Sequence, residues 1–391
     1  MSAPDLGEGL DTLADNVDRP DLYALRRTAG RLLPGHRVRH CGCTPRRNPD
    51  GSAAQIQIQP GQVSGLQTCG SPHVCPVCSL KIAKGAPGKA GRRDDVAACL
   101  AWMQGQGGFL VFFTLTLSHG PQDSLSDLVA AQRRAWRRMT QGKAWKALRG
   151  PYVRTWEATH GANGWHPHYH LTVLMKDPGD GEAILAEWIR CVRAEGMTAA
   201  PAGQDAQTVE DVEALNRYHV KAWNLADEHT NGLAKAGTGR SPWKLLAAAH
   251  DGDAKAAALF KEYAGCTQGR RTITYSRGLK AAAGVADHTD DELAAAEVDA
   301  PVMAVVDPAL FKAAIRADHR IERELRAMSK AYHEQFGADL PEDWLEPLFD
   351  ALGITYVRRG KTYLHSTPNC SKAPPNETRQ KRTPSTPHQV A

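Results

Sequence analysis

The feature that most constrains the fold is a pair of strand-like segments joined by a short polar turn. Residues 151–159 (PYVRTWEAT) and 166–175 (HPHYHLTVLM) are rich in β-branched and aromatic residues, and the turn HGANGW between them holds two glycines and an asparagine. This pattern predicts an antiparallel hairpin. Because side chains alternate along a strand, His166, His168 and His170 are expected to point to one face of a sheet.

The segments around the hairpin predict a mixed domain of the α+β class. Its expected elements are an apolar strand at 109–117, a long helix from 121 to about 148, a helix around 182–196, a short extended piece near 207–212 and a helix from roughly 213 to 227. The resulting order, β-α-β-β-α-β-α, is typical of a split β-α-β arrangement of the ferredoxin-like or RRM-like kind. In that arrangement one antiparallel sheet carries helices on a single face, so the other face is free to hold a site.

A carboxylate on the partner strand completes a candidate metal site. Glu157 lies across the turn from the histidines, so two imidazoles and a carboxylate can bind one divalent ion and leave positions open for a substrate. Isolated histidines are usually structural or simply exposed, whereas three at this spacing favour metal binding. An ion with open positions can polarise a phosphoryl oxygen, so cleavage of a phosphodiester is reasonable chemistry. The ligands do not select the metal, because imidazole favours later transition ions whereas Mg²⁺ or Mn²⁺ are usual for phosphate chemistry.

Tyr218 is the candidate nucleophile for a covalent mechanism. It lies in NRYHVKAW, on the helix expected after the last strand, and Lys221 follows it closely enough to stabilise a phenolate or a phosphate. A tyrosine oxygen forms a phosphodiester of the same energy class as the one that it breaks. Alternatively, Tyr218 is a core residue, because Leu215, Ala222 and Leu225 form an apolar helical stripe with it. The residue pattern alone leaves both interpretations open.

A cysteine cluster predicts a second metal site. Five of the nine cysteines fall between residues 41 and 78, a density typical of metal ligation rather than of disulfides in a reducing cell. The candidate zinc ligands are Cys41, Cys43, Cys69, Cys75 and Cys78, with His73 as a substitute for one of them. Four of these ligands would form a closed tetrahedral Zn²⁺ site. The alternative, that these are unligated small hydrophobic residues, does not account for the C-x2-C spacing.

A basic block lies in and after the expected long helix. The candidate DNA-binding residues in it are Arg133, Arg134, Arg137, Arg138, Lys143 and Lys146, with Trp136 and Trp145 interleaved. A charge run usually marks a solvated helix face, whereas interleaved aromatic residues add weight to contact with a nucleic-acid backbone. The net charge of the chain is only +5, so its overall balance does not indicate a nucleic-acid partner.

Three motifs resemble those of rolling-circle plasmid replication initiators, the Rep proteins of the HUH endonuclease superfamily, and in particular the single-tyrosine group of Gram-positive and actinobacterial plasmids. FFTLTLSH resembles the first motif of that family, GWHPHYHLTVLM its metal-binding second motif, and RYHVKAW its third motif, which contains the nucleophilic tyrosine. The resemblance covers roughly residues 40 to 285.

The resemblance implies a specific chemistry. His168 and His170, with Glu157, would bind Mg²⁺ or Mn²⁺, and Tyr218 would attack the scissile phosphate of single-stranded origin DNA. The products are a 5′-phosphotyrosine and a 3′-OH that primes leading-strand synthesis, and the enzyme later rejoins the displaced strand. Relatives place a water-activating glutamate four residues before the tyrosine, where this chain has Ala214, and Glu213 is a neighbouring carboxylate.

The same resemblance implies partners and a compartment. The implied partners are plasmid origin DNA, which is single-stranded at the nick and duplex nearby, where the cysteine cluster could contact it, and a host helicase, polymerase and single-strand-binding protein. Dimerisation is left open. No apolar run reaches the roughly 20 residues of a membrane span, and the first residues lack a secretion signal. We therefore expect a cytoplasmic protein without a membrane partner.

The whole chain is expected to divide into five parts. These are an acidic N-terminal segment at 1–35, a cysteine-rich zinc-binding element at 36–90, the HUH endonuclease core with its helical extension at 105–285, a mainly helical accessory region at 286–365 and a disordered basic tail at 366–391. Ser241-Pro242 and Asp307-Pro308 each place a capping residue before a proline, which predicts the start of a helix.

Three other functions remain open from the sequence. A transposase or relaxase would use the same HUH chemistry, a zinc-stabilised DNA-binding regulator would bind duplex without cutting, and a metal-dependent hydrolase would remain active as Tyr218→Phe. A single tyrosine in the third motif and a sequence without a Walker A loop favour a plasmid initiator that relies on a host helicase.

Overall fold

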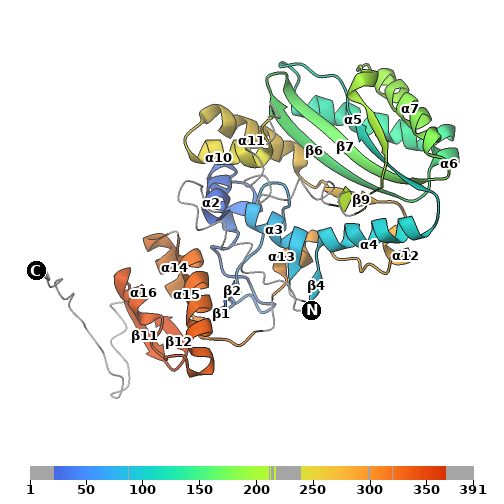
Figure 1. The fold of residues 1–391 in the computed structure, drawn as a ribbon. Coiled ribbons are helices and arrows are strands. Elements are labelled where there is room, and N and C mark those ends of the chain that lie inside the picture. The colour runs from blue at the N-terminus through green and yellow to red at the C-terminus, as the bar shows by residue number, and fades with distance from the viewer. Residues whose placement is uncertain are drawn as a thin grey trace, which may run out of the picture. The chain divides into compact units, whose positions relative to one another are not determined.

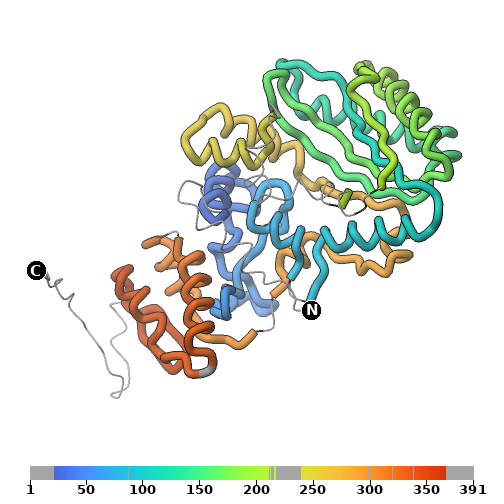
Figure 2. Tube along the Cα trace, viewed as in Figure 1, coloured from blue at the N-terminus to red at the C-terminus, as the bar shows by residue number. Residues whose placement is uncertain are grey.

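The computed structural model describes residues 22–86, 88–210, 212, 215–216, 239–297, 300–318 and 320–366. They form a mixed α+β protein of two compact units, each built from two separate stretches of the chain. Unit 1 comprises Met1–Cys41 and Thr68–Val298, and unit 2 comprises Gly42–Gln67 and Asp299–Ala391. Figure 2 allows the chain to be followed from one stretch to the next.

Unit 1 contains an antiparallel five-stranded sheet with the strand order β8-β5-β7-β6-β9. Its strands are β5 (Phe109–Leu115), β6 (Tyr152–Gly161), β7 (Gly164–Met175), β8 (Asp205–Thr208) and β9 (Ile273–Tyr275). β6 and β7 form the hairpin that the sequence predicts, and Gly161 pairs with Gly164 at its end. Gly164 has a φ of 80°, in the left-handed region that favours glycine.

The helices between β5 and β8 are α5 (Leu125–Gln141), α6 (Lys143–Leu148) and α7 (Gly181–Ala194), so the order from β5 to β8 is β-α-β-β-α-β. The single helix expected up to residue 148 is divided in two, because Gly142 has an extended backbone and caps both helices. α5 and α7 pack on one face of the sheet (Figure 1), where Val111, Phe113 and Leu115 of β5 are buried in one core with Trp188.

The second face of the sheet is partly covered, which corrects the expectation of helices on a single face. α4 (Arg92–Gly105) precedes the first expected strand, and its Val96 and Leu100 are buried with Leu110 and Phe112 of β5. Alternate residues of β5 therefore enter two different cores. The rest of this face, toward the turn of the hairpin, carries the histidines.

Among the described residues of unit 1, the remaining helices are α2 (Leu22–Leu32), α3 (Pro76–Lys84), α10 (Pro242–His250), α11 (Ala254–Thr267), α12 (Leu279–Ala282) and α13 (Asp290–Ala295), with 3-10 turns η1 (Arg37–His40), η2 (Pro178–Asp180) and η3 (Pro201–Gly203). Two short strands, β3 (Gly85–Ala86) and β4 (Lys89–Ala90), pair with each other. The predicted start of α10 is confirmed, since the Ser241 side chain accepts a hydrogen bond from the Lys244 N–H.

Unit 2 has its own five-stranded sheet, in the order β11-β12-β10-β1-β2. Its strands are β1 (Ile56–Gln59), β2 (Gln62–Ser64), β10 (Ala304–Val306), β11 (Tyr356–Arg359) and β12 (Thr362–His365), and its helices are α14 (Pro308–Ala317), α15 (Ile321–Phe336) and α16 (Glu346–Ala351), with the turn η5 (Gly337–Asp339). Ile56 and Ile58 are fully buried against Val306, Phe311 and Tyr363. α14 begins at Pro308 with Asp307 as its cap, as predicted.

This division differs from the domains expected from sequence. The element expected at 36–90 is split, because 42–67 contributes two strands to unit 2. The region expected to be mainly helical, 286–365, contains three strands, and its first residues belong to unit 1. The expected N-terminal segment and basic tail lie largely outside the described residues. Among the helices that are described, none combines the length and the apolar character needed to cross a bilayer.

Candidate functional site

Glu157, His168 and His170 bring three ligand atoms to one point on the sheet. Oε2 of Glu157 lies 3.1 Å from Nε2 of His168 and 3.3 Å from Nε2 of His170. Glu157 pairs directly with His168 across β6 and β7, and the alternation of β7 places His170 on the same face. All three ligand atoms lie within 4.8 Å of one another. The structure thus brings together three of the four metal ligands that the sequence predicts.

The spacing of these atoms suits one divalent cation. Two ligand atoms at right angles, each about 2.1 Å from an octahedral ion, lie about 3.0 Å apart. The two distances from the Glu157 carboxylate, 3.1 and 3.3 Å, are close to this value. The group can therefore hold a metal ion on one side and leave other coordination positions open.

The electrostatics of the group also favour a cation. Burial by itself raises the pKa of the Glu157 carboxyl, but the hydrogen bonds and electrostatic attraction of His168 and His170 outweigh burial and hold this pKa well below its usual range. Glu157 is therefore an anion, and its charge attracts a cation to this group. Nδ1 of His168 lies 3.3 Å from the carbonyl oxygen of His166, which can only accept, so Nδ1 donates and Nε2 of a neutral ring offers a lone pair to a metal.

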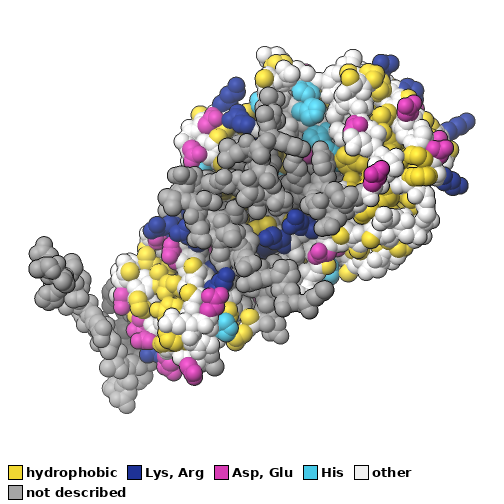
Figure 3. Space-filling view, viewed as in Figure 1, with side chains coloured by type: hydrophobic (Ala, Val, Ile, Leu, Met, Phe, Trp, Pro, Cys, Tyr) yellow, Lys and Arg dark blue, Asp and Glu magenta, His cyan; other side chains and the backbone are white. Residues whose placement is uncertain are grey.

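His166, the fourth predicted ligand, lies beside this group but outside it. Its Nδ1 is 2.7 Å from Nε2 of His119, whose Nδ1 lies 2.8 Å from the carbonyl oxygen of Asn163 in the hairpin turn. Burial, together with His168 and His119, lowers the pKa of His166 to about 4. His119 was not singled out from the sequence, although it ends the first motif. Figure 3 shows histidine side chains that reach the surface on this face of the molecule.

Four cysteine sulfurs form a second ligand group in unit 1. The Sγ atoms of Cys41, Cys69, Cys75 and Cys78 lie within 4.8 Å of one another, and all four residues are buried. Sγ of Cys78 is 3.5 Å from that of Cys41 and 3.7 Å from that of Cys69. Four sulfurs around a tetrahedral Zn²⁺, each at about 2.3 Å, lie about 3.8 Å apart. No disulfide joins any cysteine in the described part of the chain, so the group has the spacing of a zinc site and is not a pair of disulfides.

Cys43 and His73, the other residues allowed by the spacing, do not join the four sulfurs. Sγ of Cys43 lies 4.0 Å from Oγ1 of Thr44, and this residue belongs to unit 2. His73 lies between Cys69 and Cys75 in the sequence, but its ring contacts Tyr263. Hydrogen bonds from the other three sulfurs hold the pKa of the Cys78 thiol well below its usual range, which favours a thiolate there.

The basic block divides into paired and unpaired side chains. Arg134 and Arg138 both form ion pairs with Glu195, at 2.7 and 2.9 Å. The exposed members without an ion pair among the described residues are Arg133, Arg137, Lys143 and Lys146. Trp145 is buried and packs edge-on against the half-buried Trp136, so both tryptophans pack with the core rather than forming an exposed stacking surface for bases.

The predicted nucleophile Tyr218 lies outside the described residues, as do Lys221 and Glu213. Leu215 is described, and it is buried in the same cluster as Phe112, whose ring stacks on that of His170 at 5.5 Å. The chain therefore reaches the histidine-bearing face of the sheet just before its third motif.

Residues 61–300, more than half of the chain, match the model of a family described as replication protein. The chain belongs to the replication protein family. This membership confirms the resemblance that the motifs indicate. The matched range of the replication protein family includes Cys69, Cys75 and Cys78, the Glu157 group and Tyr218.

Two curated relatives match parts of the chain. A protein named Protein rep from Streptomyces lividans is 27% identical over 243 residues, which cover 50% of this chain and 52% of the relative. A protein named Neomycin resistance protein from Streptomyces cyanogenus is 32% identical over 148 residues, 30% of this chain and 32% of the relative. The chain thus spans about half the length of the first relative and about a third of the second. No solved structure matches it.

Proposed function

We propose that this replication protein is a plasmid rolling-circle initiator that nicks and rejoins single-stranded origin DNA by HUH chemistry. The observation that carries the proposal is the convergence of Glu157, His168 and His170 on the open part of a β-α-β-β-α-β sheet in a member of the replication protein family. Such a group of ligands suits phosphoryl transfer, in which catalysis comes mostly from positioning the reacting groups and stabilising the charge that develops on the phosphate.

The three ligands fit Mg²⁺ or Mn²⁺. The ion would polarise the scissile phosphate and stabilise the charge that develops on its oxygens. Glu157 contributes the anionic ligand, and two contacts fix the imidazoles: the His166 carbonyl orients His168, and the Phe112 ring stacks on His170. These contacts hold the ligands in place before DNA binds, which lowers the cost of organising the site.

Tyr218 is assigned the nucleophilic role. Its phenolate oxygen forms a bond to phosphorus while the bond from phosphorus to the 3′ oxygen breaks, and the departing oxygen takes up a proton to become a 3′-OH. The 5′-phosphotyrosine conserves the energy of the broken bond, so rejoining is the reverse attack by a 3′-OH. Lys221 would stabilise the phenolate, and Glu213 is assigned to water activation at termination. The burial of Leu215 beside Phe112 supports this placement of the third motif.

The other predicted residues have supporting roles in this proposal. Cys41, Cys69, Cys75 and Cys78 would hold a structural Zn²⁺, and exposed basic residues of α5 and α6 would follow the phosphate backbone. The host would supply the helicase, polymerase and single-strand-binding protein in the cytoplasm.

The test is a cleavage assay with a labelled single-stranded oligonucleotide from the plasmid origin, Mn²⁺ and the full chain, resolved on a denaturing gel. We expect a covalent protein–DNA adduct that requires the metal and is absent with Tyr218→Phe and His168→Ala. Cleavage by Tyr218→Phe without an adduct would indicate a hydrolase, and binding without cleavage of any origin sequence would indicate a DNA-binding regulator.

A further inference from the structure

His73 is a buried histidine that belongs to neither ligand group. It lies in the loop between Cys69 and Cys75 and is only 5% exposed. Its Nδ1 is 3.2 Å from the hydroxyl of Tyr263, and its Nε2 is 3.2 Å from the carbonyl oxygen of Arg270 and 3.3 Å from Oγ1 of Thr272. Because a carbonyl only accepts, Nε2 carries the proton and Nδ1 accepts from the Tyr263 hydroxyl. Both nitrogens of the ring are therefore engaged.

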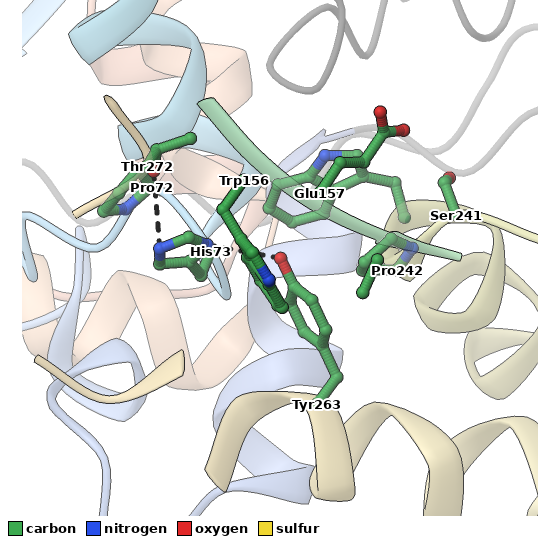
Figure 4. Close-up of a pocket in the computed structure, with 10 residues that line it drawn as sticks. Pro72, His73, Trp156, Glu157, Ser241, Pro242, Tyr263 and Thr272 are labelled. Atoms are coloured by element: carbon green, nitrogen blue, oxygen red, sulfur yellow. Dashed lines mark hydrogen bonds between the residues drawn. The ribbon is translucent and has the colours of Figure 1, made fainter. Parts of the chain in front are cut away.

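The first path from His73 to the candidate metal site runs through aromatic stacking. Tyr263 stacks on Trp156, with ring centroids 6.1 Å apart and an interplanar angle of 17°. Trp156 is the residue before Glu157 on β6, so the two side chains point to opposite faces of the sheet. Figure 4 shows His73, Trp156 and Tyr263 grouped together and the Glu157 carboxylate directed away from them. Because the two residues are adjacent on one strand, a shift of the Trp156 backbone would also shift Glu157.

The second path runs through the backbone. The Trp156 N–H donates to the carbonyl oxygen of Thr272 at 3.1 Å. His73 fixes the same short segment at two points, the Arg270 carbonyl and the Thr272 hydroxyl. The main chain next to Glu157 is thus held by a segment that His73 itself holds.

A third set of hydrogen bonds extends the network to β7, the strand that carries His168 and His170. Nε1 of Trp156 donates to Oε1 of Gln132 at 3.0 Å, and Nε2 of Gln132 donates to the carbonyl oxygen of Pro167 at 3.3 Å. Pro167 directly precedes His168, and Gln132 is fully buried. The buried network therefore reaches both strands that carry metal ligands, and buried networks of satisfied hydrogen bonds resist displacement.

We infer that His73 is a positioning residue that connects the cysteine-bearing loop to Glu157 and His168, so that cation affinity at Glu157, His168 and His170 depends on an ordered cysteine cluster. The inference rests on the proposed function, because it takes these three residues as the cation site. Partners outside the first ligand shell commonly change metal affinity by about 10- to 100-fold. The cysteine cluster then contributes to the chemistry as well as to the stability of its own loop.

The test measures Mn²⁺ binding to the full chain directly, by the loss of the free Mn²⁺ signal in electron paramagnetic resonance. We expect His73→Ala to weaken binding by about 10-fold or more. Tyr263→Phe keeps the stacked ring but removes the hydroxyl, and should weaken binding less. His73→Gln, whose amide supplies one donor and one acceptor, should restore part of the affinity. His250→Ala removes another half-buried histidine of unit 1, bonded to Thr28, and should bind as the natural protein does.

One further variant separates the possible failures. His168→Ala removes a proposed ligand and should abolish tight binding; wild-type affinity in this variant would overturn the cation site and the proposed function with it. If His168→Ala loses Mn²⁺ while His73→Ala binds at wild-type strength, the positioning role is wrong and the site stands. All titrations are made below the lowest melting transition of the variants, so that affinity refers to folded protein.

A double variant tests the connection to the cysteines. Cys78→Ser disturbs the four-sulfur group, and by this inference it acts on Mn²⁺ affinity through His73. Its effect should therefore be small when His73→Ala is already present, because effects on a shared path are not additive. Full additivity of the two changes would overturn the connection.

Discussion

His73 makes the stability of unit 1 depend on pH in a predictable direction. Burial lowers its pKa from 6.5 to about 4, so between these values the unfolded chain binds more protons than the folded one. The contribution of His73 to the free energy of unfolding is complete above pH 6.5 and is lost as the pH falls toward 4. Its full size is about 3 kcal/mol.

We expect the free energy of unfolding of the natural protein to fall more steeply between pH 6.5 and 4 than that of His73→Gln. Urea unfolding followed by circular dichroism at a series of pH values measures the difference, and the comparison removes contributions that both proteins share, such as that of His166. Parallel curves of stability against pH for the two proteins would show that the His73 ring takes up a proton in the folded state over this pH range, and the prediction would be wrong.

At the scale of single residues, the spacing of residues in the sequence predicted the contacts between the paired strands β6 and β7. It missed contacts between segments that are distant in the chain. The alternation of β7 and the antiparallel register were enough to bring His168 and His170 to Glu157. The partner of His166 could not be found in this way, because His119 follows a strand 47 residues earlier. Likewise, cysteine spacing gives the number of thiolates but not the direction of each side chain, so Cys43 could not be separated from the ligating four.

At the scale of elements, the hairpin turn is sensitive to one methyl group. Gly164 has a φ of +80°, and a Cβ there would lie 2.6 Å from the carbonyl oxygen of Gly120. We expect Gly164→Ala to destabilise unit 1 by about 2 kcal/mol, because strain and a backbone clash add. The change should also weaken Mn²⁺ binding, since the turn joins the two ligand-bearing strands.

Gly105→Ala is the matched control for this prediction. Gly105 ends α4, has no atom within 4 Å of an added Cβ, and does not require a left-handed backbone. Replacement by alanine should leave stability unchanged or raise it by up to about 1 kcal/mol. Chemical unfolding of both variants in parallel measures the effect, and equal losses of stability would contradict the prediction.

Elements with a clear local period were predicted, and those that depend on distant partners were not. The hairpin, β5 and α7 have strong hydrophobic patterns and formed as expected. α4 has a weaker hydrophobic pattern, because its apolar residues pack in a small cluster with Leu110 and Phe112. The sequence therefore did not reveal that α4 covers part of the second face of the sheet. The division of the long helix at Gly142 depends on a backbone conformation that composition alone does not reveal.

At the scale of the whole molecule, the two units allow stability and metal binding to be separated. Ile58 is fully buried in the core of unit 2 with Val306 and Tyr363. We expect Ile58→Ala to destabilise unit 2 by about 3 kcal/mol and to leave Mn²⁺ affinity in unit 1 unchanged. Limited proteolysis with mass spectrometry should show new cuts within 42–67 and 300–366.

Gln57→Ala serves as the control, because Gln57 is exposed on the same strand. It should change neither the cleavage pattern nor the affinity. A loss of Mn²⁺ binding in Ile58→Ala would show that the two units do not behave independently. The sequence could not predict unit 2, since the residues that complete its sheet are separated by more than half of the chain.

The discontinuity of unit 2 has a consequence during synthesis. Ile58 on β1 pairs with Ala304 on β10, so β1 leaves the ribosome long before its partner exists. At about 5–20 residues per second, the wait is on the order of tens of seconds. Through that interval the apolar side of the β1–β2 hairpin has no core of its own to enter. A message truncated before residue 304 would therefore yield a nascent chain with permanently uncovered strands, a natural substrate for chaperones and proteases.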